Sequence, residues 1–121
     1  MATDAPVNSR NLRRMAKRAI MGLAKTGGIA SNGSGDYVIA FSSNPEMRTS
    51  NSSKNATESY SELRNDRMSP LFMATIEATE EAILNSLFAA TPIQTVKGRE
   101  IQPLPVDKVL KILKKYGRKG K

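Results

Sequence analysis

The sequence predicts an α/β fold that is incomplete within these 121 residues. Three stretches, beginning near Ser9, Ser69 and Val106, carry apolar residues at the spacing of amphipathic helices. Only residues 37–41 form a near-continuous apolar run with β-branched and aromatic side chains, which is typical of a buried strand. One strand cannot satisfy its edge hydrogen bonds, and three apolar helix faces need a surface to cover. We therefore expect a fragment of an α/β domain, or one subunit of an obligate pair.

The N-terminal stretch reads as a strand end, a turn and a helix. Residues 1–3 are typical of a strand end and residues 4–6 of an exit turn. Ser9 is the expected N-cap of the helix, and Gly27 and Gly28 are expected to end it. One apolar stripe follows the helical period and consists of Leu12, Met15, Ala16, Ala19, Ile20 and Leu23.

The central stretch combines the strand with a long polar segment. We expect the strand at residues 37–41 to be buried on both faces. Residues 43–67 are rich in Ser, Asn and Glu and show no periodicity. So long a stretch within a compact domain is either a functional loop or disordered. Its N-x-S/T matches at Asn51 and Asn55 are expected to be chance matches.

A second helix is expected over residues 69–90. Ser69 as N-cap and Pro70 as the first helical residue form a specific start signal. Its apolar face consists of Phe72, Ile76, Thr79, Ile83 and Leu87.

The C-terminal stretch predicts an extended piece and a third helix. Residues 95–104 are expected to be extended, with a turn at Gly98. The helix is expected over residues 106–116, where Gly117 stops it and a basic tail, residues 117–121, remains.

Composition limits the chemistry that the chain can carry. Cys and His are absent, which excludes disulfides, thiolate chemistry, the usual general base and the commonest metal ligand. Catalysis would have to use hydroxyls, carboxylates, lysine or a chain-terminal amine. No segment approaches the roughly 20 apolar residues of a membrane helix, and no signal peptide is visible, so localisation stays open with the cytoplasm as the default.

The net charge of +8 is concentrated at the two ends of the chain. Residues 1–27 carry +5 and residues 107–121 carry +6, whereas residues 28–106 carry −3. This distribution is compatible with binding to nucleic acid or to a membrane surface. The more common explanation for such charge runs is solvated helix faces and a basic tail.

The glycine-rich segment Asn32-Gly33-Ser34-Gly35-Asp36 is the densest candidate site. It is not a Walker loop, because no lysine follows the glycines and the segment precedes a strand rather than a helix. It is not a serine nucleophile elbow either, because glycine directly precedes the serine and the order is not strand, turn, helix. From the residue types alone, an ordinary turn in which Ser34 and Asp36 cap backbone amides is the commoner structure.

Several blocks of the sequence, in order, resemble the C-terminal part of the DmpA-type aminopeptidases, the L-aminopeptidase/D-esterase and β-peptidyl aminopeptidase family. The resemblance covers most of the chain except residues 43–67. The blocks are "ATDAP" (2–6), "NLRRMAKRAIMGLAKTGG" (11–28), "NGSGD" (32–36), "VIAFS" (38–42), "SPLFMATIEATEEAILNSLFAAT" (69–91) and "LPVDKVLKILKKYGR" (104–118).

The resemblance implies an α/β/β/α four-layer sandwich of the N-terminal-nucleophile type. It implies a precursor that cleaves itself before a Ser or Thr, which becomes the nucleophile at the start of the smaller, C-terminal subunit. The expected partners are the larger upstream subunit of the same precursor and further copies of the processed heterodimer. The expected substrates are peptides, amino-acid amides or esters, with no metal or organic cofactor and no membrane.

By match to the family motif, Ser34 is the hydroxyl that orients the nucleophile's amine, and Asp36 is the acid that balances its charge. Asn32, Gly33 and Gly35 would position this loop. Some relatives carry glutamate at the position of Asp36. No Ser or Thr stands where the family places its nucleophile, and the family's oxyanion-stabilising groups lie upstream.

We therefore expect a C-terminal fragment of an aminopeptidase that is inactive when isolated. The alternatives are a small basic nucleic-acid-binding protein, which the charged ends favour, and a non-catalytic subunit that packs with a separately encoded partner. Against nucleic-acid binding stand the lack of a known motif and the presence of only three Tyr and three Phe for base stacking.

Overall fold

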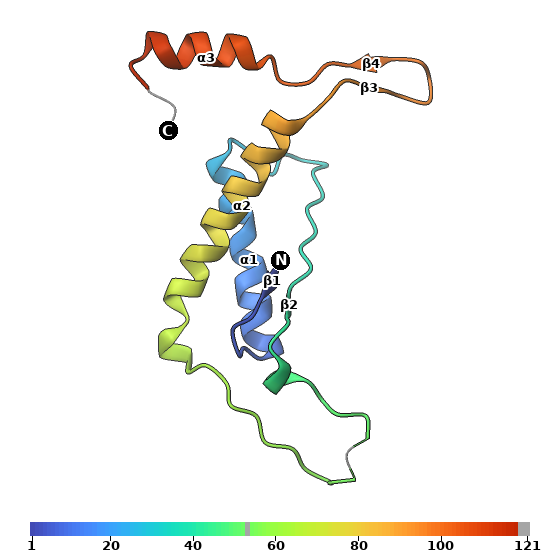
Figure 1. Cartoon of the computed structure of the whole chain (residues 1–121), viewed down its shortest axis with the longest axis vertical. Coiled ribbons are helices and arrows are strands. Elements are labelled where there is room, and N and C mark those ends of the chain that lie inside the picture. The colour runs from blue at the N-terminus through green and yellow to red at the C-terminus, as the bar shows by residue number, and fades with distance from the viewer. Residues whose placement is uncertain (53, 119–121) are drawn as a thin grey trace. The chain divides into compact units, whose positions relative to one another are not determined.

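A computed structural model describes residues 1–52 and 54–118, and the chain divides into two compact units, Met1–Glu81 and Ala82–Lys121. In chain order the elements are β1 (Ala2–Thr3), α1 (Ser9–Lys25), β2 (Phe41–Ser42), two short 3₁₀ helices (Pro45–Met47 and Asn65–Arg67), α2 (Ser69–Ala89), β3 (Ile93–Gln94), β4 (Glu100–Ile101) and α3 (Val106–Lys115) (Figure 1). The three helices lie where the apolar periodicity predicts them.

Helix α1 begins one residue earlier than predicted. The side chain of Asn8, not that of Ser9, is the N-cap: it accepts a 2.9 Å hydrogen bond from the amide of Asn11. Asparagine caps a helix as well as serine does, and Asn8 directly precedes the predicted cap Ser9. The C-terminal end is as predicted, because the helix stops at Lys25 and Gly27 adopts the left-handed backbone, with φ of +96°.

The core of the first unit lies between α1, the start of α2 and the turn after β1. Val7, Met15 and Met68 are buried together, and the polar segment after β2 returns to this core where the Leu63 amide donates to the Pro6 carbonyl at 2.7 Å. Other apolar side chains pack around them, namely Met1, Ala5, Leu12, Leu63, Leu71 and Phe72.

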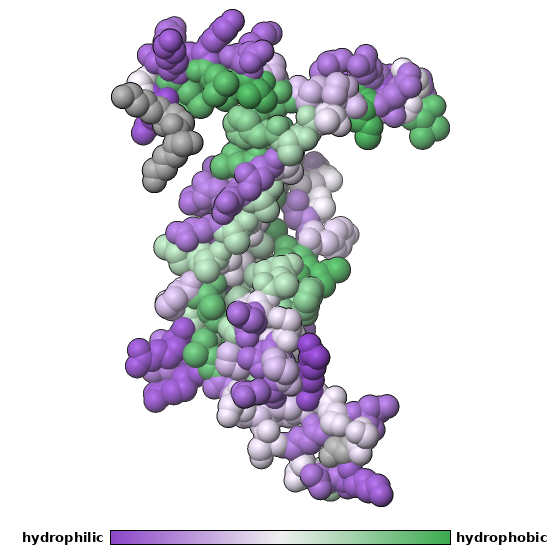
Figure 2. Space-filling view, in the orientation of Figure 1, coloured by the Kyte–Doolittle hydropathy of each residue, from purple (hydrophilic) through white to green (hydrophobic). Residues whose placement is uncertain are grey.

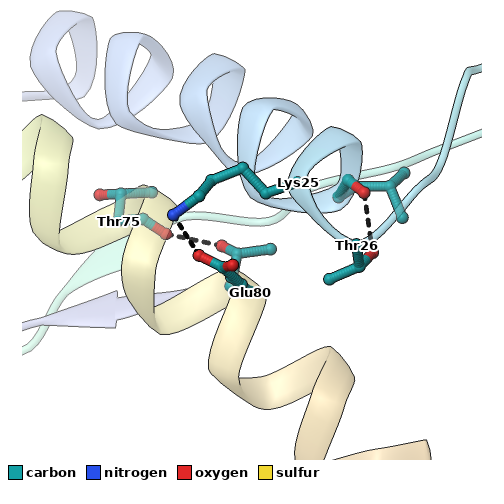
Figure 3. A network of polar contacts seen from close by, with 6 residues as sticks. Lys25, Thr26, Thr75 and Glu80 are labelled. Atoms are coloured by element: carbon teal, nitrogen blue, oxygen red, sulfur yellow. Dashed lines mark hydrogen bonds and ion pairs between the residues drawn. The ribbon is translucent and has the colours of Figure 1, made fainter. Parts of the chain in front are cut away.

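Polar contacts between the helices surround this core. Lys25 at the end of α1 forms an ion pair with Glu80 of α2 (Figure 3). The guanidinium groups of Arg14 and Arg18 lie over the Phe72 ring, at 4.8 and 3.5 Å from its centroid. Part of the positive charge of α1 therefore contributes to helix packing.

The strand predicted over residues 37–41 is much shorter in the structure. Strand β2 pairs in parallel with β1, with Ala2 opposite Phe41 and Thr3 opposite Ser42. Tyr37 and Ile39 are 95% and 80% exposed, so the expectation of burial on both faces is wrong for the described chain. Among the described residues only β1 pairs with this segment, and an apolar run becomes buried only when strands or helices cover it.

The start of α2 is also one residue away from its predicted cap. Ser69 is already helical, and the amide of Phe72 donates to the Met68 carbonyl at 3.1 Å. The segment 43–67 carries the two 3₁₀ helices and otherwise no regular structure in its described part. Met68, directly after it, is 1% exposed and anchors it in the core.

The second unit contains the end of α2, a hairpin and α3. Strands β3 and β4 pair antiparallel, and Gly98 adopts a positive φ in the turn that was predicted there. Helix α3 ends before Gly117, as predicted, and residues 119–121 of the basic tail lie outside the described residues. Hydrophobic residues follow one side of α3 and hydrophilic residues the other (Figure 2).

Apolar side chains of the second unit are poorly covered. From Ala82 to Arg118 the structure buries no residue fully, and Phe88, Ile93 and Val96 are exposed. Among the helices that the structure describes, none combines the length and apolarity needed to span a lipid bilayer.

Candidate active-site segment

A tight turn presents the candidate residues between α1 and β2. The amide of Ser34 donates to the Ser31 carbonyl at 2.8 Å, which closes the turn around Asn32 and Gly33. Gly33 has φ of +90°, a backbone conformation that is strained for any residue with a side chain, so glycine is required there. Gly35 is less constrained, because an added Cβ would have ordinary contact with the Tyr37 ring at 3.7 Å.

The structure brings Ser34 and Asp36 together. The Ser34 hydroxyl donates to Asp36 Oδ2 over 3.3 Å, a long hydrogen bond between two exposed side chains. Neither residue belongs to a strand, since β2 starts at Phe41. The pair meets through the local path of the chain after the turn.

The surroundings of this pair are almost free of other charges along the chain. Asp36 is the only charged side chain between Lys25 and Glu46. A lone exposed carboxylate beside a hydroxyl stabilises the fold little, because both groups are well solvated. The pair can, however, accept hydrogen bonds from an ammonium group and balance its charge.

The same pair is poorly suited to act as nucleophile and base by itself. Activation of a serine needs an adjacent base, and a solvated carboxylate is a weak one. Across residues 1–52 and 54–118 no three metal-ligating side chains gather closely enough to hold a metal ion. The arrangement can therefore hold and orient a cationic group that comes from elsewhere.

The N-terminal end of β1 lies on the side of β2 from which this segment enters. The amine of Met1 donates to the Ile39 carbonyl at 2.7 Å, so the parallel pairing continues beyond the two strand residues. Going back along the chain from Ile39, the same backbone passes Asp36 and Ser34. The polar segment 43–67 instead leaves the opposite end of β2 (Figure 1).

A polar pocket of about 660 Å³ lies within that segment, where Glu46, Arg48 and Tyr60 are among its lining residues. Because it follows the far end of β2, it is separate from the Ser34–Asp36 pair.

Comparison with known proteins gives concordant results. The chain matches the model of peptidase family S58 over residues 1–101. It is 43% identical over 119 residues to a β-peptidyl aminopeptidase of Sphingosinicella microcystinivorans, a match that takes in 98% of this chain and 29% of the relative. The chain thus spans less than a third of the length of that curated relative.

Two solved structures extend the comparison to the fold. A β-aminopeptidase of a Burkholderia species is similar with a TM-score of 0.81 and 32% identity, covering 98% of this chain and 35% of that one. The l-aminopeptidase d-ala-esterase/amidase of Ochrobactrum anthropi is described as a prototype of the serine aminopeptidases with a variant of the Ntn hydrolase fold. It is similar with a TM-score of 0.83 and 26% identity, and the match covers 95% of this chain and 32% of that one. These likenesses confirm the predicted α/β fold of the N-terminal-nucleophile type and the resemblance to the DmpA-type aminopeptidases.

Proposed function

Because the chain belongs to peptidase family S58, we propose that it is the C-terminal part of a self-processing aminopeptidase. The parent protein cleaves its own chain before a Ser or Thr, and that residue then hydrolyses N-terminal amide, peptide or ester bonds. The contact between the Ser34 hydroxyl and the Asp36 carboxylate is the observation that carries this proposal.

The contact matters because the chain contains no histidine. A free α-amino group has a pKa of about 7.7–8.0, so at neutral pH it can act as base for the hydroxyl of its own residue. Such an amine needs a hydrogen-bonding partner that fixes its orientation and a carboxylate that balances its positive charge. Ser34 and Asp36 supply these two groups.

The register of β1 on β2 supports this arrangement. Ala2 pairs with Phe41 and Thr3 with Ser42, an offset of 39 residues. If upstream sequence extends β1 on the same offset, residues 34–36 would come opposite the positions four to six residues before Met1. A Ser or Thr that opens the strand at one of those positions has its amine beside the Ser34–Asp36 pair.

The reaction follows from this placement. The nucleophile's hydroxyl oxygen bonds to the substrate carbonyl carbon while its proton moves to the nucleophile's own amine. The tetrahedral intermediate collapses, the proton passes to the leaving nitrogen, and an acyl ester remains. Water then attacks the ester by the same route, releasing the acid and restoring the hydroxyl.

In this proposal the chain provides the supporting half of the site. The nucleophile and the groups that stabilise the oxyanion belong to upstream sequence, and the larger subunit made from it covers the exposed run of Tyr37, Ile39 and Phe41. Monomeric soluble proteins rarely expose neighbouring large apolar side chains in a contiguous patch.

The test compares the 121-residue chain with its full-length parent. We expect the parent to split into two bands on a denaturing gel and to release p-nitroaniline from aminoacyl p-nitroanilides, whereas the purified 121-residue chain does neither. Turnover by the isolated chain would refute the proposal that the nucleophile lies upstream. A parent that neither splits nor turns over would refute the self-processing aminopeptidase.

A further inference from the structure

Three groups at the C-terminal end of β2 and just after it donate to three consecutive carbonyls at the end of β1 and just after it. The Ser43 amide donates to the Thr3 carbonyl at 2.8 Å, the Asn44 side-chain amide to the Asp4 carbonyl at 2.9 Å, and the Ser42 hydroxyl to the Ala5 carbonyl at 2.7 Å. Ser42 and Asn44 are both half-buried. None of these contacts involves the Ser34–Asp36 pair, which lies at the other end of the strand.

The two side chains are themselves held in place. The backbone amide of Asn44 donates to the Ser42 hydroxyl oxygen at 3.2 Å, which ties the Ser42 side chain to the backbone of Asn44. Asn44 Oδ1 accepts from the Glu46 amide at 2.9 Å and caps the first 3₁₀ helix. Its side-chain NH2 is therefore fixed toward the Asp4 carbonyl.

The side chains of Ser42 and Asn44, called the clamp below, contact residues of the β1 turn in a way that depends on the strand register. Strands β1 and β2 share only two paired positions, and a parallel pair of that length specifies its register weakly. A slip of one residue moves a strand by about 3.3 Å and turns its side chains to the other face. The clamp contacts reach Asp4 and Ala5 individually, so any slip breaks both.

We propose that Ser42 and Asn44 are positioning residues that align the upstream continuation of β1, and with it the nucleophile's amine, against Ser34 and Asp36. The inference rests on the proposed function. The inference depends on distance, because an amine displaced by one residue along the strand is beyond hydrogen-bonding reach of the Ser34 hydroxyl. Sequence patterns gave no indication of these two residues, because Ser and Asn after a strand are ordinary turn residues.

The test uses the full-length parent with Asn44→Asp, Ser42→Ala and Ser42→Thr. Asn44→Asp keeps the oxygen that caps the 3₁₀ helix but loses the donor to the Asp4 carbonyl. Ser42→Thr keeps the hydroxyl that Ser42→Ala removes. Ser50→Ala is the matched control, since the Ser50 hydroxyl lies in the polar segment, where among the described residues it contacts Ser52.

We expect Asn44→Asp and Ser42→Ala to slow self-cleavage and to lower kcat by roughly tenfold to a hundredfold, the cost of misplacing a reacting group by about an ångström or more. KM should change little, and the pH profile of kcat/KM should shift, because the amine's partners are misaligned. Ser42→Thr should restore most of the rate, and Ser50→Ala should match the wild type.

Unchanged kcat and an unchanged pH profile in both Asn44→Asp and Ser42→Ala would overturn the proposal. So would a loss of rate that merely follows a lower melting temperature and that Ser42→Thr fails to rescue. If the wild-type parent has no activity, the proposed function itself has failed. An active wild type with unaffected clamp variants refutes only the clamp.

Discussion

Gly22 of α1 lies directly against Thr79 of α2. A Cβ added to Gly22 would stand 2.7 Å from the Thr79 Cβ and 2.6 Å from the Ile76 carbonyl oxygen, closer than real side chains approach. The two helices therefore meet through backbone at this point. The close approach also brings the ends of Lys25 and Glu80 within reach of one another (Figure 3).

Replacing Gly22 by alanine tests this packing. Alanine favours a helix interior over glycine by about 1 kcal/mol, but overpacking at a rigid backbone contact costs about 1–3 kcal/mol. We expect Gly22→Ala to lower the free energy of unfolding, measured by urea denaturation followed by circular dichroism. Met21→Ala, at an exposed neighbouring position, is the control. A Gly22→Ala variant as stable as the wild type would contradict the contact.

The buried position of Met68 makes a second prediction. Met68, just before α2, is 1% exposed in the core of the first unit, whereas Met73, within α2, is 57% exposed. Truncating a buried methionine to alanine costs about 2–5 kcal/mol. We expect Met68→Ala to destabilise by about that amount in urea denaturation and Met73→Ala by much less. Equal effects would show that the segment before α2 is not anchored in the core.

The contact between Arg18 and the Phe72 ring leads to a third prediction. The guanidinium carbon is 3.5 Å from the ring centroid, and a cation over an aromatic ring at a partly exposed site contributes about 0.5–1 kcal/mol. We expect Arg18→Met and Phe72→Leu to show a coupling energy of that order in a double-mutant cycle. Arg18→Lys should keep part of it. Additive single effects would mean that the arginine only packs against the ring.

The helices could be predicted from the sequence, whereas the strand could not. Met15 and Ala19 are buried on the stripe that helical periodicity selects, because a helix folds on contacts within its own segment. Tyr37 and Ile39 form an equally clear apolar run, yet they are exposed, because strand burial depends on neighbours that the described chain supplies only through β1.

The candidate site could be predicted in part, because only some of its contacts are local in the sequence. Ser34 and Asp36 lie two residues apart, so local sequence alone brings their side chains within reach. The Asn44 contact with Asp4 spans 40 residues and appears only once the strands are paired. No pattern within a short window identifies such a partner.

The roles of Ser34 and Asp36 give the sharpest prediction about the full-length parent. Ser34→Ala removes the hydroxyl proposed to orient the nucleophile's amine, and Asp36→Asn removes the charge that balances it. General acid–base contributions of this kind are worth roughly a hundredfold or more in rate. We expect both variants to lose self-cleavage or turnover by at least that factor, followed by gel analysis and p-nitroaniline release. Asp36→Glu, which keeps the charge, should retain more activity than Asp36→Asn.

Ser31→Ala separates this role from the integrity of the turn. Ser31 contributes its carbonyl to the turn that presents Ser34, so removing its hydroxyl leaves the turn's hydrogen bond intact. We expect Ser31→Ala to self-cleave and turn over substrate like the wild type. Both Ser31→Ala and Ser34→Ala should have the melting temperature of the wild type. Wild-type rates in Ser34→Ala would remove Ser34 from the site. Equal losses in Asp36→Glu and Asp36→Asn would show that the position of the carboxylate matters as much as its charge, since glutamate places its carboxylate one methylene further from the backbone.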